Sequence, residues 1–214
     1  MSGLLILGAG GHAKVVAETA IASGVASSVA FLDDRCTGPD AGPFVLGWPV
    51  IGPLALALQA DTRPQFDAAV VAIGHAITRL FWIEKLQSAG YPLPVLMHPT
   101  SWVSSSAQIG PASVVFAQAT VQAQASIGKG AILNTSCSVD HDAQLSDAVH
   151  ICPGARLAGE VKVGARSWIG IGASVIQQVC IGSDVTVGAG AAVVRDLPNG
   201  VTAVGVPARV VSSN

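Results

Sequence analysis

A six-residue repeat runs through the second half of this chain and constrains its fold more than any other feature. From Val103 to Val193, every sixth residue is Val, Ile or Leu, at sixteen successive positions without an insertion. The apolar face of an α-helix recurs about every 3.6 residues and that of a coiled coil about every 3.5, so neither fits this period. A period of six predicts a chain wound into flat sides and corners, with one large aliphatic side chain per side pointing inward.

A second row of residues supports the same frame. Four residues after each aliphatic, from Ala107 to Ala191, the residue is Ala, Ser or Cys at eleven of fifteen positions and Val at the others. Three six-residue segments would close one turn, so the repeat predicts a parallel β-helix of about five turns. The repeat does not reveal the hand of the coil, although right-handed crossovers are the general rule.

Glycine often follows the inward aliphatic residue. We expect these glycines to relieve tight corners at which φ is positive. They are Gly110, Gly128, Gly164, Gly170, Gly182 and Gly188.

Residues 1–98 lack this repeat and alternate strand-like with helix-like segments. The alternation predicts a small α/β domain with a parallel sheet, interrupted by a Gly/Pro-rich loop after the second strand. The expected strands are residues 4–7, 29–32 and 68–73, and the expected helices are residues 13–23, 53–60 and 77–89. Ligands of such domains bind beyond the carboxyl ends of the strands. The residues that fall there are Gly10, Gly11, His12, Asp33, Asp34 and Gly74.

A glycine-rich turn follows the first expected strand. Gly8-x-Gly10-x-x-Ala13, with Asp33 about twenty residues further on, matches a loose dinucleotide-binding fingerprint and taken literally predicts an NAD enzyme. The domain is too small for a full dinucleotide-binding unit. A phosphate or nucleotide at the amino end of the next helix is therefore the favoured interpretation. A tight glycine turn without a ligand is the structural alternative.

Composition excludes several classes of protein. The net charge is −2 and no run of Lys or Arg occurs, which argues against a nucleic-acid partner. The apolar stretches are broken before they reach the roughly 18 residues that span a membrane, and the first residues lack the basic segment of a signal peptide. Without any C-x-x-C pair, the four cysteines fit a reducing cytoplasm. We expect Cys137, Cys152 and Cys180 to be small buried residues.

Several motifs occur together in one order along the chain. They are Gly8-Ala9-Gly10-Gly11-His12, Phe31-Leu32-Asp33-Asp34, Ala72-Ile73-Gly74, Asn134, His141-Asp142, His150 and Gly205-Val206-Pro207-Ala208-Arg209. Over nearly its whole length, the chain thereby resembles the bacterial hexapeptide-repeat acyltransferases. Within them it is similar to the group of sialic acid O-acetyltransferases and nucleotide-amino-sugar N-acetyltransferases.

This resemblance implies a domain organisation and a function. It implies a Rossmann-like α/β domain at 1–98 that binds a nucleotide-sugar, a left-handed β-helix at 99–198, and a C-terminal tail at 199–214 with the G-x-P-A-R motif. The implied enzyme is a cytoplasmic homotrimer that needs no metal and binds neither nucleic acid nor membrane. It would transfer the acetyl group of acetyl-CoA to the C4 amino group of a nucleotide-linked 4-amino-4,6-dideoxy sugar. The expected sugar is GDP-perosamine, in O-antigen or surface polysaccharide biosynthesis.

The resemblance also implies roles for single residues. His141 would be the catalytic base and Asp142, where some relatives carry Glu, its partner. Contacts to the nucleotide-sugar would come from Gly10, Gly11, His12, Asp33, Asp34, Gly74 and Asn134. Contacts to acetyl-CoA, in the groove between neighbouring β-helices, would come from His150, Ile171, Ala189 and Arg209.

The surroundings of His141 suit this chemistry. His141 stands two positions after the inward Val139, so its side chain should point outward. A neutral imidazole, with an ordinary pKa of about 6.5, can accept the proton that an amine loses when it attacks a thioester. A carboxylate can fix the tautomer of such a base. Asp140 and Asp142 both flank it, and we favour Asp142.

Other functions remain open from the residues alone. A metal-dependent carbonic anhydrase on a β-helix needs three imidazole ligands, whereas the repeat holds only His141 and His150. A catalytically silent sensor of sugar-nucleotides would differ from an enzyme only in lacking acetyl-CoA turnover. The residues do not distinguish GDP- from UDP- or dTDP-linked sugars, or an amine from a hydroxyl acceptor.

Overall fold

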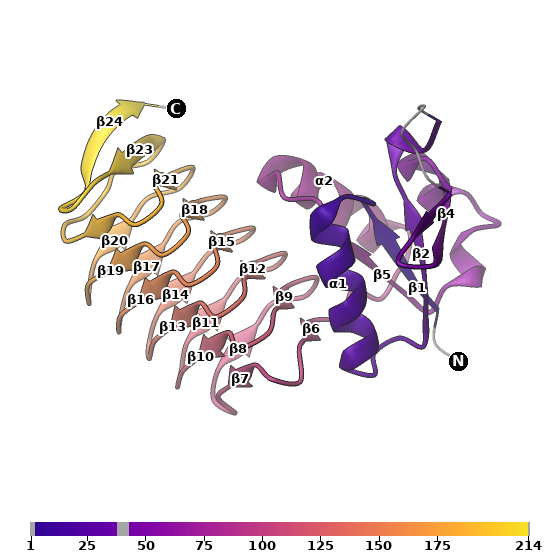
Figure 1. Cartoon of the computed structure of the whole chain (residues 1–214), viewed down its shortest axis with the longest axis horizontal. Helices are drawn as coiled ribbons and strands as arrows, with labels where there is room; N and C mark the ends of the chain where they lie inside the picture. The colour runs from indigo at the N-terminus through magenta and orange to yellow at the C-terminus, as the bar shows by residue number, and fades with distance from the viewer. Residues whose placement is uncertain (1–2, 38–42, 214) are drawn as a thin grey trace. The chain divides into compact units, whose positions relative to one another are not determined.

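The computed structural model describes residues 3–37 and 43–213, so part of the expected Gly/Pro-rich loop lies outside the described residues. The chain forms two compact units, Met1–Met97 and His98–Asn214. Among its described residues, the first contains two α-helices and a sheet, and the second is a stack of short strands (Figure 1).

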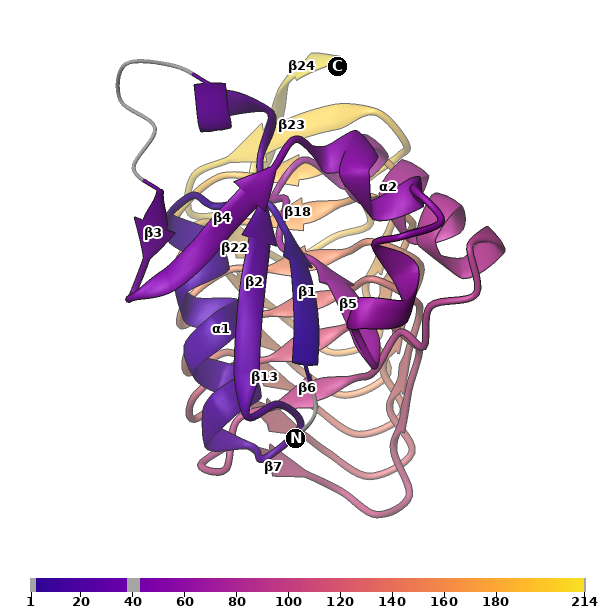
Figure 2. The ribbon, with the colours of Figure 1, turned by 90° about the vertical axis from the view of Figure 1, so that its right-hand side faces the viewer.

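The first unit is built on a five-stranded sheet with the order β3-β4-β2-β1-β5. Its strands are β1 (Gly3–Leu7), β2 (Ser28–Leu32), β3 (Phe44–Val45), β4 (Trp48–Gly52) and β5 (Ala68–Val71). Strand β1 lies between β2 and β5 and pairs in parallel with both, as Figure 2 shows. The expected parallel sheet is thus confirmed. The β3–β4 hairpin was not predicted, and β4 extends the sheet beyond β2.

Two helices connect the parallel strands. In α1 (Gly11–Ala22), buried Ala13, Val16, Ala17 and Ala20 follow the spacing that forms one apolar helix face. In α2 (Ala76–Ser88), the Nδ1 atom of His75 accepts a hydrogen bond from the backbone N–H of Thr78 and caps the first turn. These contacts fix the helix that follows β1 and the helix that follows β5.

The helix expected at residues 53–60 is shorter than predicted and is not an α-helix. The chain there forms a short 3₁₀ helix, η2 (Leu54–Leu58), between η1 (Asp34–Thr37) and η3 (Arg63–Gln65). Only Leu54 and Ala57 are buried in η2, three residues apart, which is the spacing that a 3₁₀ helix aligns.

The second unit is a left-handed parallel β-helix with three faces. Along one face, Val103 pairs with Val121 and Val121 with Val139, so each turn takes the expected 18 residues. The first face holds β7 (Trp102–Val103), β10 (Thr120–Val121), β13 (Ser138–Val139), β16 (Arg156–Leu157), β19 (Ser174–Val175) and β22 (Ala192–Val193). The second holds β8 (Gln108–Ile109), β11 (Ser126–Ile127), β14 (Gln144–Leu145), β17 (Lys162–Val163) and β20 (Cys180–Ile181).

The third face continues into the C-terminal residues. It holds β9 (Val114–Val115), β12 (Ile132–Leu133), β15 (His150–Ile151), β18 (Trp168–Ile169) and β21 (Thr186–Val187). Beyond β21 it adds β23 (Val201–Val204) in parallel and then β24 (Arg209–Ser213) in antiparallel orientation. Residues expected only as a tail therefore close the end of the coil. The short strand β6 (Leu96–Met97) ends the first unit.

The two predicted rows of small and large residues form the core of the coil. From Val115 to Val193, the aliphatic at every sixth position is buried, and Val103 and Ile109 pack against this core partly buried. The small residues of the second row, such as Ala119 and Cys137, are buried with them. Since each turn stacks on the previous one, the interior is a set of aliphatic ladders.

The prediction about the corner glycines is wrong. Positive φ occurs three residues after the inward aliphatic, at every sixth position from Ala112 to Gly190, and most of these residues are not glycine. The glycines directly after the aliphatic serve a different need. A Cβ on Gly110 would lie 2.6 Å from backbone atoms of Gly128 and Lys129 in the next turn. Close packing of successive turns therefore selects glycine there.

The expectation for the cysteines holds only in part. Cys137 and Cys152 are buried, whereas Cys180 is exposed. Cys180 directly precedes the inward Ile181, and successive residues of a strand point to opposite sides. Among the described residues, no helix has the length and apolar character needed to cross a bilayer.

Candidate active site

The loops after β1, β2 and β5 lie at one edge of the first sheet, because these strands are parallel neighbours. Gly8 has a φ of 105°, and a Cβ there would lie 2.8 Å from the carbonyl oxygen of Ala72 after β5. Gly10 is the N-cap of α1 and Gly11 is its first residue. The sheet thus brings the predicted residues of the glycine turn close to the end of β5.

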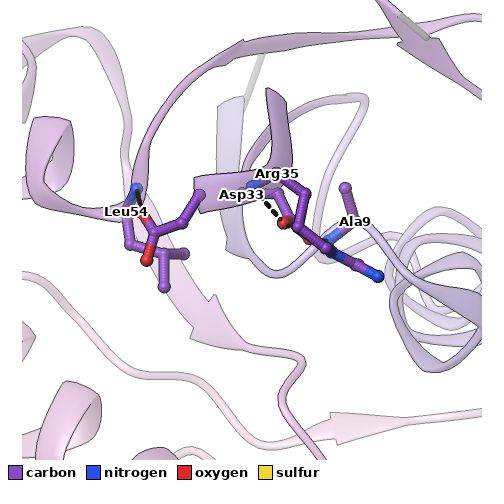
Figure 3. A network of polar contacts seen from close by, with 5 residues as sticks. Ala9, Asp33, Arg35 and Leu54 are labelled. Carbon is purple, nitrogen blue, oxygen red and sulfur yellow. Dashed lines mark hydrogen bonds and ion pairs between the residues drawn. The ribbon is translucent and has the colours of Figure 1, made fainter. Parts of the chain in front are cut away.

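Asp33, at the end of β2, is saturated with hydrogen bonds from the protein itself (Figure 3). Its Oδ2 atom accepts from the backbone N–H of Ala9 at 2.8 Å and from Nη2 of Arg35 at 2.9 Å. Its Oδ1 atom accepts from the backbone N–H of Arg35 at 2.9 Å and from Nε of that residue at 3.0 Å. The hydrogen bonds from the Arg35 side chain are the main reason why the pKa of Asp33 is lowered to about 2. A carboxylate with four donors has little capacity left for a ligand.

Of this ion pair, Arg35 is the member that faces solvent. Its side chain is 77% exposed, whereas that of Asp33 is only 13% exposed. A Cβ on Gly10 would lie 3.4 Å from Nη2 of Arg35, which locates the guanidinium beside the start of α1. The neighbouring Asp34 accepts the backbone N–H of Leu54 at 2.9 Å and so ties η1 to η2.

His12 and Gly74 are linked to a buried arginine. Arg79, on α2, is 1% exposed and donates from Nη1 to the carbonyl oxygens of Ile73 at 2.9 Å and Gly74 at 2.6 Å. Burial, with a smaller contribution from the charge of Arg79, lowers the pKa of His12 to about 4. His12 is consequently a neutral imidazole near pH 7.

In the β-helix, His141 forms a close pair with Asp142. Nδ1 of His141 lies 2.8 Å from Oδ2 of Asp142, and the side chains are 55% and 50% exposed. Asp142 has a φ of 59°, so the left-handed corner turns its carboxylate back toward the imidazole. Asp140 instead accepts the backbone N–H of His141 at 2.8 Å. The hydrogen bond that His141 donates to Asp142 is the main reason why the pKa of His141 is raised above its ordinary value.

Asn134 and His150 also contact one another. Nδ2 of Asn134 lies 3.1 Å from Nε2 of His150, while Oδ1 of Asn134 accepts the backbone N–H of Thr135 at 2.8 Å. The Trp168 ring packs edge-on against His150, with ring centroids 6.3 Å apart. This cluster orders one outward part of the third face.

The remaining predicted cofactor residues are spread along the C-terminal turns. Ile171 is 56% exposed, and its carbonyl accepts the N–H of Gly190, the residue next to Ala189, at 2.8 Å. Arg209 begins β24, and its Nη1 atom donates to the carbonyl oxygen of Ala208 at 2.9 Å. Within residues 3–37 and 43–213, no group of three His, Cys, Asp or Glu side chains is arranged to hold a metal ion.

Sequence reasoning missed four residues that contact the predicted ones. They are Arg35, Arg79, Gly159 and Trp168. Gly159 and Trp168 follow His141 and His150 by one turn of 18 residues, so the repeat period would have located both. No repeat points to Arg35 or Arg79, because their contacts depend on how the chain turns after β2 and between β5 and α2.

Comparison with known proteins finds similarity over the whole chain. Residues 3–86 match the family described as the PglD N-terminal domain. The chain is 45% identical to the acetyltransferase domain of PglB from Neisseria gonorrhoeae FA1090, solved with acetyl coenzyme A, with 98% of each chain covered and a TM-score of 0.92. It is 42% identical to perosamine N-acetyltransferase from Caulobacter crescentus, with 100% of this chain and 98% of that chain covered and a TM-score of 0.91.

The Caulobacter structure is that of a His→Asn mutant in complex with CoA and GDP-perosamine. A more distant match is WeeI from Acinetobacter baumannii AYE, at 27% identity over 99% of this chain and 100% of that chain, with a TM-score of 0.87. The two-unit architecture is therefore common to all three proteins.

Proposed function

The chain belongs to the acyltransferase family that includes the PglB acetyltransferase domain and perosamine N-acetyltransferase, and from this premise we propose its reaction. It transfers the acetyl group of acetyl-CoA to the C4 amino group of a nucleotide-linked 4-amino-4,6-dideoxy sugar, GDP-perosamine. The observation that carries this proposal is the full-length similarity, at 42% identity, to a protein solved with CoA and GDP-perosamine. The exposed pair of His141 and Asp142 supplies the chemistry.

The pair supports a general-base mechanism. Because Asp142 accepts at Nδ1, the hydrogen of the neutral ring stays on Nδ1 and Nε2 keeps its lone pair. The sugar amine attacks the thioester carbonyl carbon, a C–N bond forms and the C–S bond breaks. Nε2 of His141 takes the proton that the amine loses and returns it to the leaving thiolate. Asp142 holds the ring and stabilises the imidazolium between these two steps.

The edge of the first sheet suits the nucleotide part of the substrate. Arg35, fixed by Asp33, presents a cation beside the amino end of α1, where backbone N–H groups also favour phosphate oxygens. Gly11 and Gly74 leave open space, since a Cβ on either would meet no atom within 4 Å. In this proposal, Asp33 acts through Arg35 and the glycine turn, while His12, Asp34 and Asn134 complete the contacts to the nucleotide-sugar.

The C-terminal turns suit acetyl-CoA. Exposed Ile171 and the small Ala189 offer an apolar surface for the chain that carries the thiol, and Arg209 offers a charge for the phosphates. His150, held by Asn134, completes this set. We further propose that the enzyme is a cytoplasmic homotrimer, with acetyl-CoA between neighbouring coils, and that it serves surface polysaccharide synthesis.

The test is a thiol-release assay with acetyl-CoA and a panel of GDP-, UDP- and dTDP-linked 4-amino-4,6-dideoxy sugars. Turnover is expected with the GDP-linked amine, and a GDP-linked 4-hydroxy analogue should release no thiol. Preference for a UDP- or dTDP-linked sugar would overturn the nucleotide assignment. Turnover of the hydroxyl analogue would make the enzyme an O-acetyltransferase.

The pH dependence of catalysis should report the pairing of His141 with Asp142. Because the base must be neutral, kcat/KM should fall as the pH drops through the raised pKa of His141. Asp142→Asn removes the main cause of this raised pKa, so the acidic limb of the pH profile should move to lower pH. Asp184→Asn is the matched control, because Asp184 is an exposed, ion-paired residue with a φ of 56° at another corner. An acidic limb that does not move in Asp142→Asn would contradict the pairing.

Asp33→Ala should weaken binding of the nucleotide-sugar rather than of acetyl-CoA. Loss of the carboxylate frees the N–H of Ala9 and the guanidinium of Arg35. We expect KM for the nucleotide-sugar to rise about tenfold, which corresponds to about 1.4 kcal/mol, and KM for acetyl-CoA to stay nearly constant.

The control for this prediction is Asp67→Ala. Asp67 accepts the backbone N–H of Gly3 at 2.9 Å. Gly3 begins β1, whereas Ala9, which donates to Asp33, follows the end of that strand. This variant loses a similar bond far from the proposed site, so both KM values should be unchanged. If Asp33→Ala raised KM for acetyl-CoA more than KM for the nucleotide-sugar, the first unit would not be the nucleotide-sugar-binding unit.

A further inference from the structure

Gly159 lies against the catalytic ring. A Cβ on Gly159 would be 2.5 Å from both Cε1 and Nε2 of His141 and 3.2 Å from its Cδ2. Real Cβ atoms essentially never approach other atoms to less than 3.0 Å. The three nearest atoms all belong to this one imidazole, so the ring occupies the space that any side chain at residue 159 would need.

The backbone conformation at residue 159 does not require glycine. Gly159 does not have a positive φ. It stands two residues after the inward Leu157, and the equivalent places one turn earlier and later hold His141 and Gln177. The coil therefore accommodates large side chains at this corner.

The glycines that the coil does need behave differently. A Cβ on Gly110 would be 2.6 Å from backbone atoms of Gly128 and Lys129, which cannot move without opening the turn. At Gly159 the obstacle is a side chain that is 55% exposed and has solvent to swing into. A methyl group at Gly110 thus disturbs the fold, whereas one at Gly159 displaces only the imidazole.

We propose that Gly159 is a positioning residue for the reaction, because its missing side chain lets the His141 ring lie flat against the coil with Nδ1 on Asp142. The catalytic meaning of this role rests on the proposed function. With Ala at residue 159, the ring must rotate away, the 2.8 Å contact to Asp142 breaks, and Nε2 leaves the place from which it takes the proton. An error of about 1 Å at a reacting group costs on the order of 10²-fold in rate.

The test compares Gly159→Ala with Gly110→Ala. We expect Gly159→Ala to keep its thermal midpoint within a few degrees and to lose at least about tenfold in kcat. We expect Gly110→Ala to lower the midpoint while its folded fraction keeps the wild-type kcat. In a His141→Asn background, Gly159→Ala should cause no further loss, since it acts through the ring.

A ligand-free measurement separates this role from the proposed function. The carboxylates that raise the pKa of His141 are Asp142, by its hydrogen bond, and Asp140, Asp142 and Glu160 by their charge. In Gly159→Ala, NMR titration of the imidazole should show a lower pKa, because the bond to Asp142 is lost. This result would stand even if no amino sugar in the panel were acetylated.

Three outcomes would overturn the proposal. An unchanged imidazole pKa together with wild-type kcat would mean that the ring does not depend on Gly159. An equal loss of rate in the wild-type and His141→Asn backgrounds would mean that the added methyl acts on something other than the ring. Failure of Gly159→Ala to fold would mean that glycine serves the coil after all.

Discussion

His141→Asn is expected to lower kcat by at least about tenfold. A general base typically contributes a rate factor of about 10²–10⁴. Asparagine keeps a polar side chain of similar size. It lacks the basic Nε2 atom with which His141 takes the proton from the amine. The side chain is 55% exposed and contributes nothing to the core, so the thermal midpoint should not change. Steady-state kinetics with acetyl-CoA and GDP-perosamine, beside a thermal melt, would measure both.

The matched control is His98→Asn. His98 also lies in the second unit, and its Nδ1 contacts Thr100 at 2.9 Å, but it has no part in the proposed mechanism. This variant should retain the wild-type kcat. If His141→Asn turned over as fast as the wild type, the proton would have to leave by another route and the pair with Asp142 would lose its catalytic meaning.

Ile151→Asp should cause the largest loss of stability. Ile151 is 0% exposed in the ladder of aliphatic side chains, with Leu133 and Ile169 in the turns on either side. A carboxylate there has no partner, and the cavity left by the isoleucine adds to the cost. We expect the free energy of unfolding to fall by about 4 kcal/mol or more, and the thermal midpoint by about 10 °C.

Ile176→Asp makes the same change on the outside of the coil. Ile176 directly follows the inward Val175 and is 43% exposed, so an aspartate there remains in water. Ile176→Asp should lower the free energy of unfolding by less than about 1 kcal/mol. Equal melting curves for the two variants would mean that the six-residue row does not form the interior.

The chemistry of the candidate site could be predicted better than its contacts. The histidine and its neighbouring aspartate are adjacent in sequence, so Asp142 could be favoured from the residues alone. Which of the two flanking carboxylates meets the ring depends on the corner, where a φ of 59° turns Asp142 toward Nδ1 and leaves Asp140 on the backbone N–H. The prediction of positive φ at the glycines failed because a glycine can serve close packing as well as an unusual backbone angle.

In the first unit, Asp33 shows how far a ligand contact could be predicted from the sequence. Its place after a parallel strand marked it as a ligand contact, yet in the structure its carboxylate is filled by Ala9 and Arg35. Arg35 is only two residues away in sequence, but its contact arises because the chain turns into η1 directly after β2. The predicted residue thus marks the right edge of the sheet, while the group offered to solvent is its neighbour.

The sequence by itself determined the three-sided coil, although not its hand, because a strict period of six buries every aliphatic of the row only in a coil with three sides of six residues each. It also determined the parallel sheet of the first unit through alternating apolar strands and helices. Only the tertiary structure decided which outward residues meet: Gly159 under His141, Trp168 beside His150, and Arg79 against the loop that ends in Gly74. Burial acts on each inward residue independently and so leaves a pattern along the chain, whereas a contact between outward side chains depends on two distant positions and on the rotation of both.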